Sequence, residues 1–199
     1  MELQALYWMH GVEKTFHGFL RLNDESSIAF VQNPDIVKIP VELGKTHAGN
    51  PGANCAGGTM QHIAFKVDNH EELLALRDRL REKGVPVLGP VDHGMCVSMY
   101  FAGLENLSLE LSYSLEPINA EAWCDPEVVE LCGISQQELA RYKQSASFSD
   151  LKGAASQPSP DADGPHMTNY PAGVYEAVLS APDEAVWENS ENQPPVSIP

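Results

Sequence analysis

Residues 61–67 read QHIAFKV, and the prediction of the fold starts from this run. The apolar residues Ile63, Phe65 and Val67 alternate with residues of the opposite face, which is the period of a half-buried strand. His62 belongs to that opposite face. The run therefore predicts a strand that presents a histidine away from the hydrophobic core.

A second run, residues 108–113, reads SLELSY and alternates in the same way. Its apolar residues share one face, and Glu110 lies on the other. A histidine and a carboxylate are suitable ligands for a divalent metal ion, provided that the sheet curls so that they meet. We therefore treat His62 and Glu110 as one candidate site.

The residues between these two strands predict the rest of a folding unit. Asp68 and Asn69 are typical of a helix N-cap, and Gly84 is typical of the position just after a helix ends. Three strands follow at residues 85–91, 95–101 and 107–114, and the first contains prolines that favour a sheet edge. Residues 59–115 thus predict a β-α-β-β-β unit.

The first part of the chain resembles the last three strands of that unit. Residues 3–10 fit either a strand or a short helix, and residues 15–32 predict a hairpin with an Asn-Asp-Glu turn. Residues 19–30 align with residues 100–111 without a gap. In this alignment Ala29 takes the place of Glu110, so a repeat would supply no second carboxylate from that strand.

The remaining segments have a different character. Residues 33–58 predict a linker or covering loop. Residues 116–145 predict a helical extension, with helix starts at Asp125 and Ser135. We expect the Ser-, Pro-, Asp- and Glu-rich residues 146–199 to be mostly disordered.

The charge of the chain excludes some classes of binding partner. The formal net charge is −16, which argues against nucleic acid and against an anionic membrane surface. The sequence contains neither a long apolar stretch nor a recognisable signal peptide. The four cysteines match no zinc-site spacing, so we expect reduced thiols in a cytoplasmic protein.

The sequence resembles the vicinal oxygen chelate superfamily, which includes glyoxalases, bleomycin-resistance proteins and extradiol dioxygenases. The resemblance covers residues 3–115 and rests on the order and spacing of four motifs, at residues 60–67, 80–85, 98–101 and 109–111. It implies an α+β fold of paired βαβββ modules with curved mixed sheets. The first module, residues 1–32, would then lack its opening strand and helix.

The resemblance also implies roles for particular residues. His62 and Glu110 would be metal ligands. Tyr100 and His93 would act on the substrate as the corresponding tyrosine and histidine do in the extradiol dioxygenases. In the family the other histidine ligand belongs to the opening strand of the first module, which the resemblance leaves without a counterpart here, and a partner chain would be one source of it. We expect His17, His47 and His70 at the surface.

These features predict a metal-dependent, dioxygenase-like or lyase-like enzyme that chelates a small oxygenated substrate, with aromatic compounds among the candidates. Fe²⁺ is the first choice of metal, and Mn²⁺ or Zn²⁺ accept the same ligands. The alternative is a module that binds a small molecule without catalysis, as in bleomycin-resistance proteins, or a truncated, inactive member of the superfamily. An incomplete module leaves an open sheet edge, so we expect a homodimer.

Overall fold

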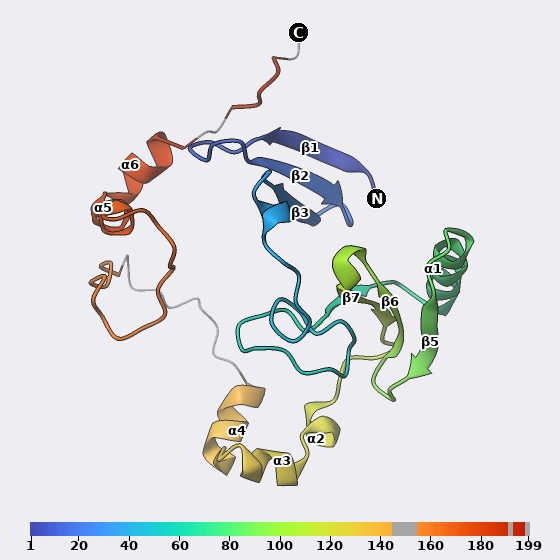
Figure 1. Ribbon diagram of the computed structural model, residues 1–199. Coiled ribbons are helices and arrows are strands. Elements are labelled where there is room, and N and C mark those ends of the chain that lie inside the picture. Colours follow the sequence, from blue (N-terminus) through green and yellow to red (C-terminus); the bar gives the residue numbers. More distant parts are fainter. Residues whose placement is uncertain (145–154, 191–192, 198–199) are drawn as a thin grey trace. The chain divides into compact units, whose positions relative to one another are not determined.

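The computed structural model in Figure 1 describes residues 1–144, 155–190 and 193–197. The chain forms two compact units. The first contains residues 1–39 and the described C-terminal segment, and the second contains residues 40–144. Each unit has one β-sheet, so the α+β class expected from the sequence is confirmed.

The sheet of the second unit has the strand order β4-β7-β6-β5. β4 runs parallel to β7, and the other neighbouring strands are antiparallel. This topology is the predicted β-α-β-β-β unit, with β5 at an edge as its prolines indicated. In chain order its elements are β4 (Ile63–Lys66), α1 (His70–Glu82), β5 (Val87–Asp92), β6 (Val97–Ala102) and β7 (Ser108–Tyr113).

Helix α1 begins and ends where the sequence predicts. The Asn69 side chain accepts a hydrogen bond from the backbone N–H of Glu72, and Gly84 follows the helix with φ of +77°. The helix covers the apolar face of the sheet, where Leu73 is fully buried. The core of this unit consists of Val67, Leu73, Met99 and Tyr113.

The opposite face of the sheet is polar, and we call it the polar face. Because side chains alternate along a strand, the neighbours of each core residue in a strand point to the polar face. They include Ser98 and Tyr100 on β6 and Ser108, Glu110 and Ser112 on β7. Ser98, Ser108 and Glu110 are buried although they are polar.

The first unit contains a three-stranded meander of β1 (Leu3–Trp8), β2 (Phe16–Arg21) and β3 (Ser27–Gln32). Within residues 3–10, which the sequence left open between strand and helix, Leu3–Trp8 thus form a strand. Phe19 pairs with Ala29 here, as Tyr100 pairs with Glu110 in the second unit. The register of the two sheets agrees with the sequence alignment and places Ala29 where the other sheet has its glutamate.

The rest of the described chain consists of short helices and irregular segments. The Asp125 cap and the Ser135–Glu138 capping box form as predicted, and the hydrogen bonds from Ser135 lower the pKa of Glu138. Two helices also form in the segment of residues 146–199 that we expected to be mostly disordered, and α5 contains its apolar run near Val178. Residues 146–154, 191–192 and 198–199 of that segment lie outside the described part. The elements are η1 (Ile36–Lys38), η2 (Leu104–Asn106), α2 (Ala120–Trp123), α3 (Pro126–Leu131), α4 (Gln136–Lys143), α5 (Val174–Ser180) and α6 (Asp183–Glu188).

The loop of residues 40–62 is irregular but folded. His47 forms isolated β-bridges with Leu43 and with Met60. We expected His47 at the surface, and this was wrong, since only 6% of the residue is exposed. The loop folds back on itself and onto the residues before β4, and a loop sequence gives no periodic pattern from which this can be predicted.

Candidate metal centre

His62 and Glu110 meet on the polar face. Nε2 of His62 lies 2.9 Å from Oε2 of Glu110. His62 directly precedes β4, and Glu110 lies in β7, the parallel neighbour of β4. The Glu110 side chain is 8% exposed and that of His62 is 31% exposed, so His62 is the more accessible member of the pair.

Tyr100 lies beside both of these residues. It is the register partner of Glu110 on β6, and its ring lies edge-on to the ring of His62 with 6.2 Å between centroids. Burial, and after it the negative charge of Glu110, raises the pKa of Tyr100 above the ordinary value of 10.0. Tyr100 therefore keeps its proton at neutral pH.

His93 completes the group from the turn between β5 and β6. Its Nε2 lies 2.9 Å from the Tyr100 hydroxyl oxygen, and the residue is exposed. The structure thus brings together the four residues that the sequence singled out. They form a continuous series of contacts from His93 through Tyr100 to Glu110 and His62.

The spacing of the pair fits two ligands of one metal ion. Ligand atoms about 2.1 Å from an octahedral ion and at right angles to each other lie about 3 Å apart. The separation of 2.9 Å between Nε2 and Oε2 agrees with this value. Within the described residues no group of three or more His, Cys, Asp or Glu side chains has metal-binding geometry. The remaining coordination positions would therefore be taken by water, by substrate or by another chain.

Sequence reasoning missed two residues next to this site. Ser98 is fully buried on the polar face, and its Oγ lies 3.6 Å from Sγ of Cys96. Gln61 contacts Nδ1 of His62 through its side-chain oxygen. Strand alternation back from Tyr100 would have placed Ser98 on this face. The role of Gln61 depends on a loop more distant in sequence, so no local pattern could have indicated it.

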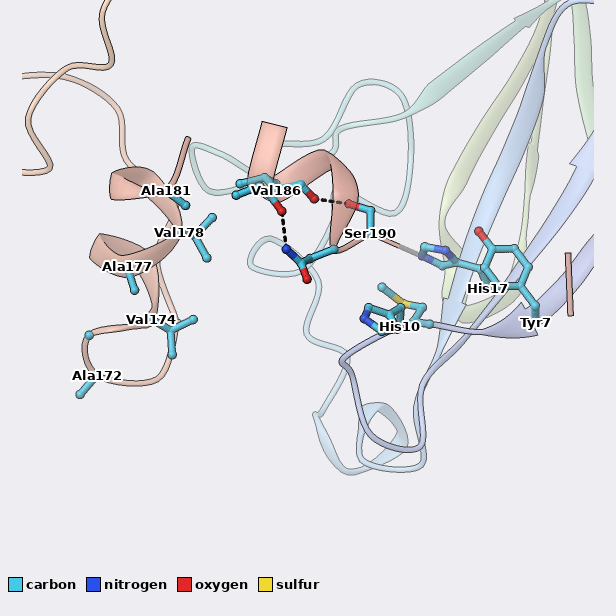
Figure 2. Close-up of a pocket in the computed structure, with 14 residues that line it drawn as sticks. Tyr7, His10, His17, Ala172, Val174, Ala177, Val178, Ala181, Val186 and Ser190 are labelled. Atoms are coloured by element: carbon cyan, nitrogen blue, oxygen red, sulfur yellow. Dashed lines mark hydrogen bonds between the residues drawn. The ribbon is translucent and has the colours of Figure 1, made fainter. Parts of the chain in front are cut away.

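The described chain has cavities in both units. In the first unit an open cavity of about 860 Å³ lies between helices α5 and α6 and the residues Tyr7, His10 and His17 (Figure 2). In the second unit a cavity of about 360 Å³ is lined by residues that include Cys96, Tyr113 and Trp123. Neither is lined by His62 or Glu110, so we assign the candidate site from side-chain chemistry and not from cavity size.

The chain belongs to the glyoxalase/bleomycin resistance protein/dioxygenase superfamily. The family model matches residues 8–110, slightly more than half of the 199 residues, and includes both His62 and Glu110. Members of this superfamily commonly use divalent metal ions. The expected resemblance is thereby confirmed.

Solved structures of similar proteins include two with informative descriptions. An integron cassette protein from the mobile metagenome of the Halifax Harbour sewage outfall has 25% identity, with 49% of this chain and 67% of that chain covered and a TM-score of 0.32. A glyoxylase/bleomycin resistance protein/dioxygenase domain from Frankia sp. EAN1pec has 14% identity, with 55% and 76% covered and a TM-score of 0.40. No curated protein matches the chain significantly.

One further property concerns membranes. Of the helices in the described residues, none combines the length and the apolar character that crossing a bilayer requires.

Proposed function

We propose that the protein is a metal-dependent enzyme of the dioxygenase-like or lyase-like kind, acting on a small oxygenated substrate. His62 and Glu110 would hold the metal ion, and a substrate with two neighbouring oxygen atoms, as in a catechol, would chelate it. The observation that carries this proposal is the contact of 2.9 Å between Nε2 and Oε2 on the polar face.

The donor atoms guide the choice of metal. One imidazole nitrogen and one carboxylate oxygen suit Fe²⁺ first, and they also accept Mn²⁺ or Zn²⁺. When bound, such an ion supplies Lewis acidity toward a developing oxyanion of the substrate. Glu110 is suited to this position because its carboxylate is almost completely shielded from water by the protein.

Tyr100 and His93 would handle the substrate's protons. Tyr100 remains protonated at neutral pH, so its hydroxyl can donate a hydrogen bond to a substrate oxygen held near Glu110. His93 contacts the same hydroxyl from the exposed side. It is therefore placed to accept a proton through Tyr100 and to exchange it with water.

A second candidate is a module that binds a small molecule without catalysis. The observation in its favour is that the described residues supply only two donors at the site. A two-ligand site binds a metal ion weakly unless another chain or the substrate adds a ligand.

Metal analysis distinguishes the two candidates. The purified protein is dialysed against Fe²⁺, Mn²⁺ or Zn²⁺ and its metal content measured beside the variants His62→Ala and Glu110→Ala. His166→Ala and Glu82→Ala are matched controls, because both residues are exposed and distant in sequence from the pair. Metal retained by the wild type and the controls but lost from both site variants supports the enzyme. No retained metal in any protein favours the binding module.

The proposal also includes a homodimer and a cytoplasmic location. Leu6 and Phe30 pair with Gly18 from opposite sides, so the three residues form one row across the first sheet. Leu6 and Phe30 are more than half exposed. The residue that corresponds to Gly18 in the other sheet is Met99, which is fully buried under α1, so the row on the first sheet lacks such a cover. Such an exposed apolar surface is typical of an interface.

All four cysteines are free, which is consistent with a reducing compartment.

A further inference from the structure

Gln61 is held in one orientation by the loop that precedes it. Its side-chain nitrogen donates to the backbone carbonyl oxygens of Asn50, Pro51 and Ala53, at 3.2, 2.6 and 3.3 Å. Three acceptors around one end of the amide identify that end as the NH₂ group, because a carbonyl oxygen there would face three other oxygens. The other end of the amide is therefore the oxygen.

This oxygen faces the ring of His62. Oε1 of Gln61 contacts Nδ1 of His62, and an amide oxygen only accepts hydrogen bonds. Nδ1 must therefore carry a hydrogen. In the neutral imidazole the hydrogen is then absent from Nε2, and the Nε2 lone pair points at the carboxylate oxygen of Glu110.

Two acceptor atoms 2.9 Å apart repel each other unless a positive centre lies between them. A proton satisfies this requirement, and so does a metal ion. The Nδ1–H tautomer leaves the lone pair of Nε2 free to bind a metal ion. In metal-binding histidines this tautomer is commonly held by an acceptor that bonds the other ring nitrogen. The alternative tautomer would place a lone pair against the Gln61 oxygen.

We propose that Gln61 is a positioning residue that holds His62 in its metal-binding tautomer, and that the loop of residues 40–60 fixes Gln61 for this task. The proposal deepens the metal-dependent function proposed above and rests on it for its purpose, although the tautomer itself can be measured without metal.

Hydrogen bonds within the loop order the turn that carries the three carbonyl groups. The N–H of Ala53 donates to the carbonyl oxygen of Asn50 at 3.3 Å, and the N–H of Gly52 donates to the side-chain oxygen of Asn50 at 2.9 Å. The N–H of Ala56 donates to the carbonyl oxygen of Gly44, and the N–H of Gly44 donates to that of His47, each at 2.9 Å. The side chain of Thr46 closes the first turn by bonding the N–H and the carbonyl oxygen of Glu42. Buried His47 then pairs with Met60, next to Gln61. A change in this loop would therefore be transmitted to the ring of His62.

The test compares the tautomer of His62 in four proteins labelled with ¹⁵N-histidine, all of which carry Glu110→Gln, because without metal the Glu110 carboxylate would itself draw the hydrogen to Nε2. The proteins are the Glu110→Gln parent and the same parent with Gln61→Met, Gln61→Glu or Gln137→Met, the last being a matched control at an exposed position of α4. Two-bond ¹⁵N–¹H correlation spectra, recorded without metal at alkaline pH where imidazole is neutral, report which nitrogen carries the hydrogen. Mn²⁺ affinity is measured in parallel by electron paramagnetic resonance on the same position-61 and position-137 variants with Glu110 intact.

We expect the Nδ1–H tautomer in the Glu110→Gln parent and the control, and a mixture in Gln61→Met. Gln61→Glu keeps an acceptor beside Nδ1 and should retain the Nδ1–H tautomer, although it loses the bonds to the loop. Mn²⁺ affinity should fall about 10- to 100-fold in Gln61→Met, the usual effect of losing an outer-shell partner.

An Nε2–H tautomer in the Glu110→Gln parent, or an unchanged tautomer in Gln61→Met, overturns the proposal. A wild type that binds no Mn²⁺, together with the expected tautomers in the Glu110→Gln series, contradicts the proposed function and leaves the positioning role of Gln61 supported. Circular dichroism of each variant establishes that a tautomer change does not come from unfolding.

Discussion

The imidazole ring of His62 lies edge-on to the phenol ring of Tyr100, at an interplanar angle of 71°. Tyr100 is also the cross-strand partner of Glu110, so one tyrosine lies against both candidate ligands. Its ionisation therefore reports on the electrostatics of the site. The relationship leads to predictions that need no knowledge of the substrate.

The first prediction concerns the pKa of Tyr100. In Glu110→Gln, measured with a chelator present, the pKa of Tyr100 should fall toward 10.0, because one of the charges that raises it is removed. The burial contribution remains, so the pKa stays above that value. Carbon-13 NMR of labelled tyrosine, assigned with Tyr100→Phe, measures it. An unchanged pKa would contradict the proximity of the carboxylate to the hydroxyl.

The same shift predicts how stability depends on alkaline pH. A pKa raised by folding means that the folded protein holds the Tyr100 proton more tightly than the unfolded chain does. The contribution to stability is thus present below pH 10.0 and is lost as the pH rises through the folded pKa. Tyr100→Phe should show a smaller loss of stability over that alkaline range. Urea unfolding of both proteins at several alkaline pH values checks this.

Tyr100→Phe should retain the metal ion but lose catalytic activity. Tyr100 is not a proposed ligand, so the variant is expected to retain metal in the dialysis experiment. It loses the hydroxyl that contacts His93 and with it the proposed route for protons. Loss of metal together with the hydroxyl would show that Tyr100 is itself needed for coordination.

The second unit should depend strongly on Leu73. This side chain is fully buried at the centre of the contact between α1 and the sheet. Leu73→Ala should lower the free energy of unfolding by about 2–5 kcal/mol, the cost of lost burial and of the cavity left behind. Leu104→Ala is the control, because Leu104 is 85% exposed and its truncation should change stability by less than about 0.5 kcal/mol.

The exposed row on the first sheet should mediate self-association. Phe30→Asp places a charge at the centre of the proposed interface and should weaken dimerisation by about 2 kcal/mol, or roughly 30-fold in the dissociation constant. Leu104→Asp in the second unit is the matched control and should leave it unchanged. Sedimentation velocity over a concentration series measures both. A wild type that is monomeric at all concentrations would exclude the homodimer.

Local patterns accounted for a large part of the fold. Strand alternation placed His62 and Glu110 on the face away from the core, and capping residues such as Asn69 and Ser135 marked helix starts correctly. These features depend on residues within one turn or one strand. The burial of His47 and the helices of the C-terminal segment did not follow from the sequence, because each depends on packing that carries no short-range period.

The sequence by itself determined the β-α-β-β-β order of the second unit and the side of each strand on which its polar residues lie, because alternation in a strand is a local property. Only the tertiary structure decided that Nε2 of His62 and Oε2 of Glu110 are within 2.9 Å, since 48 positions separate the two residues and the parallel register of β4 against β7 sets the distance. It also decided which nitrogen of His62 faces Glu110, because the three carbonyl groups that orient Gln61 come from a loop whose shape is fixed by its own hydrogen bonds.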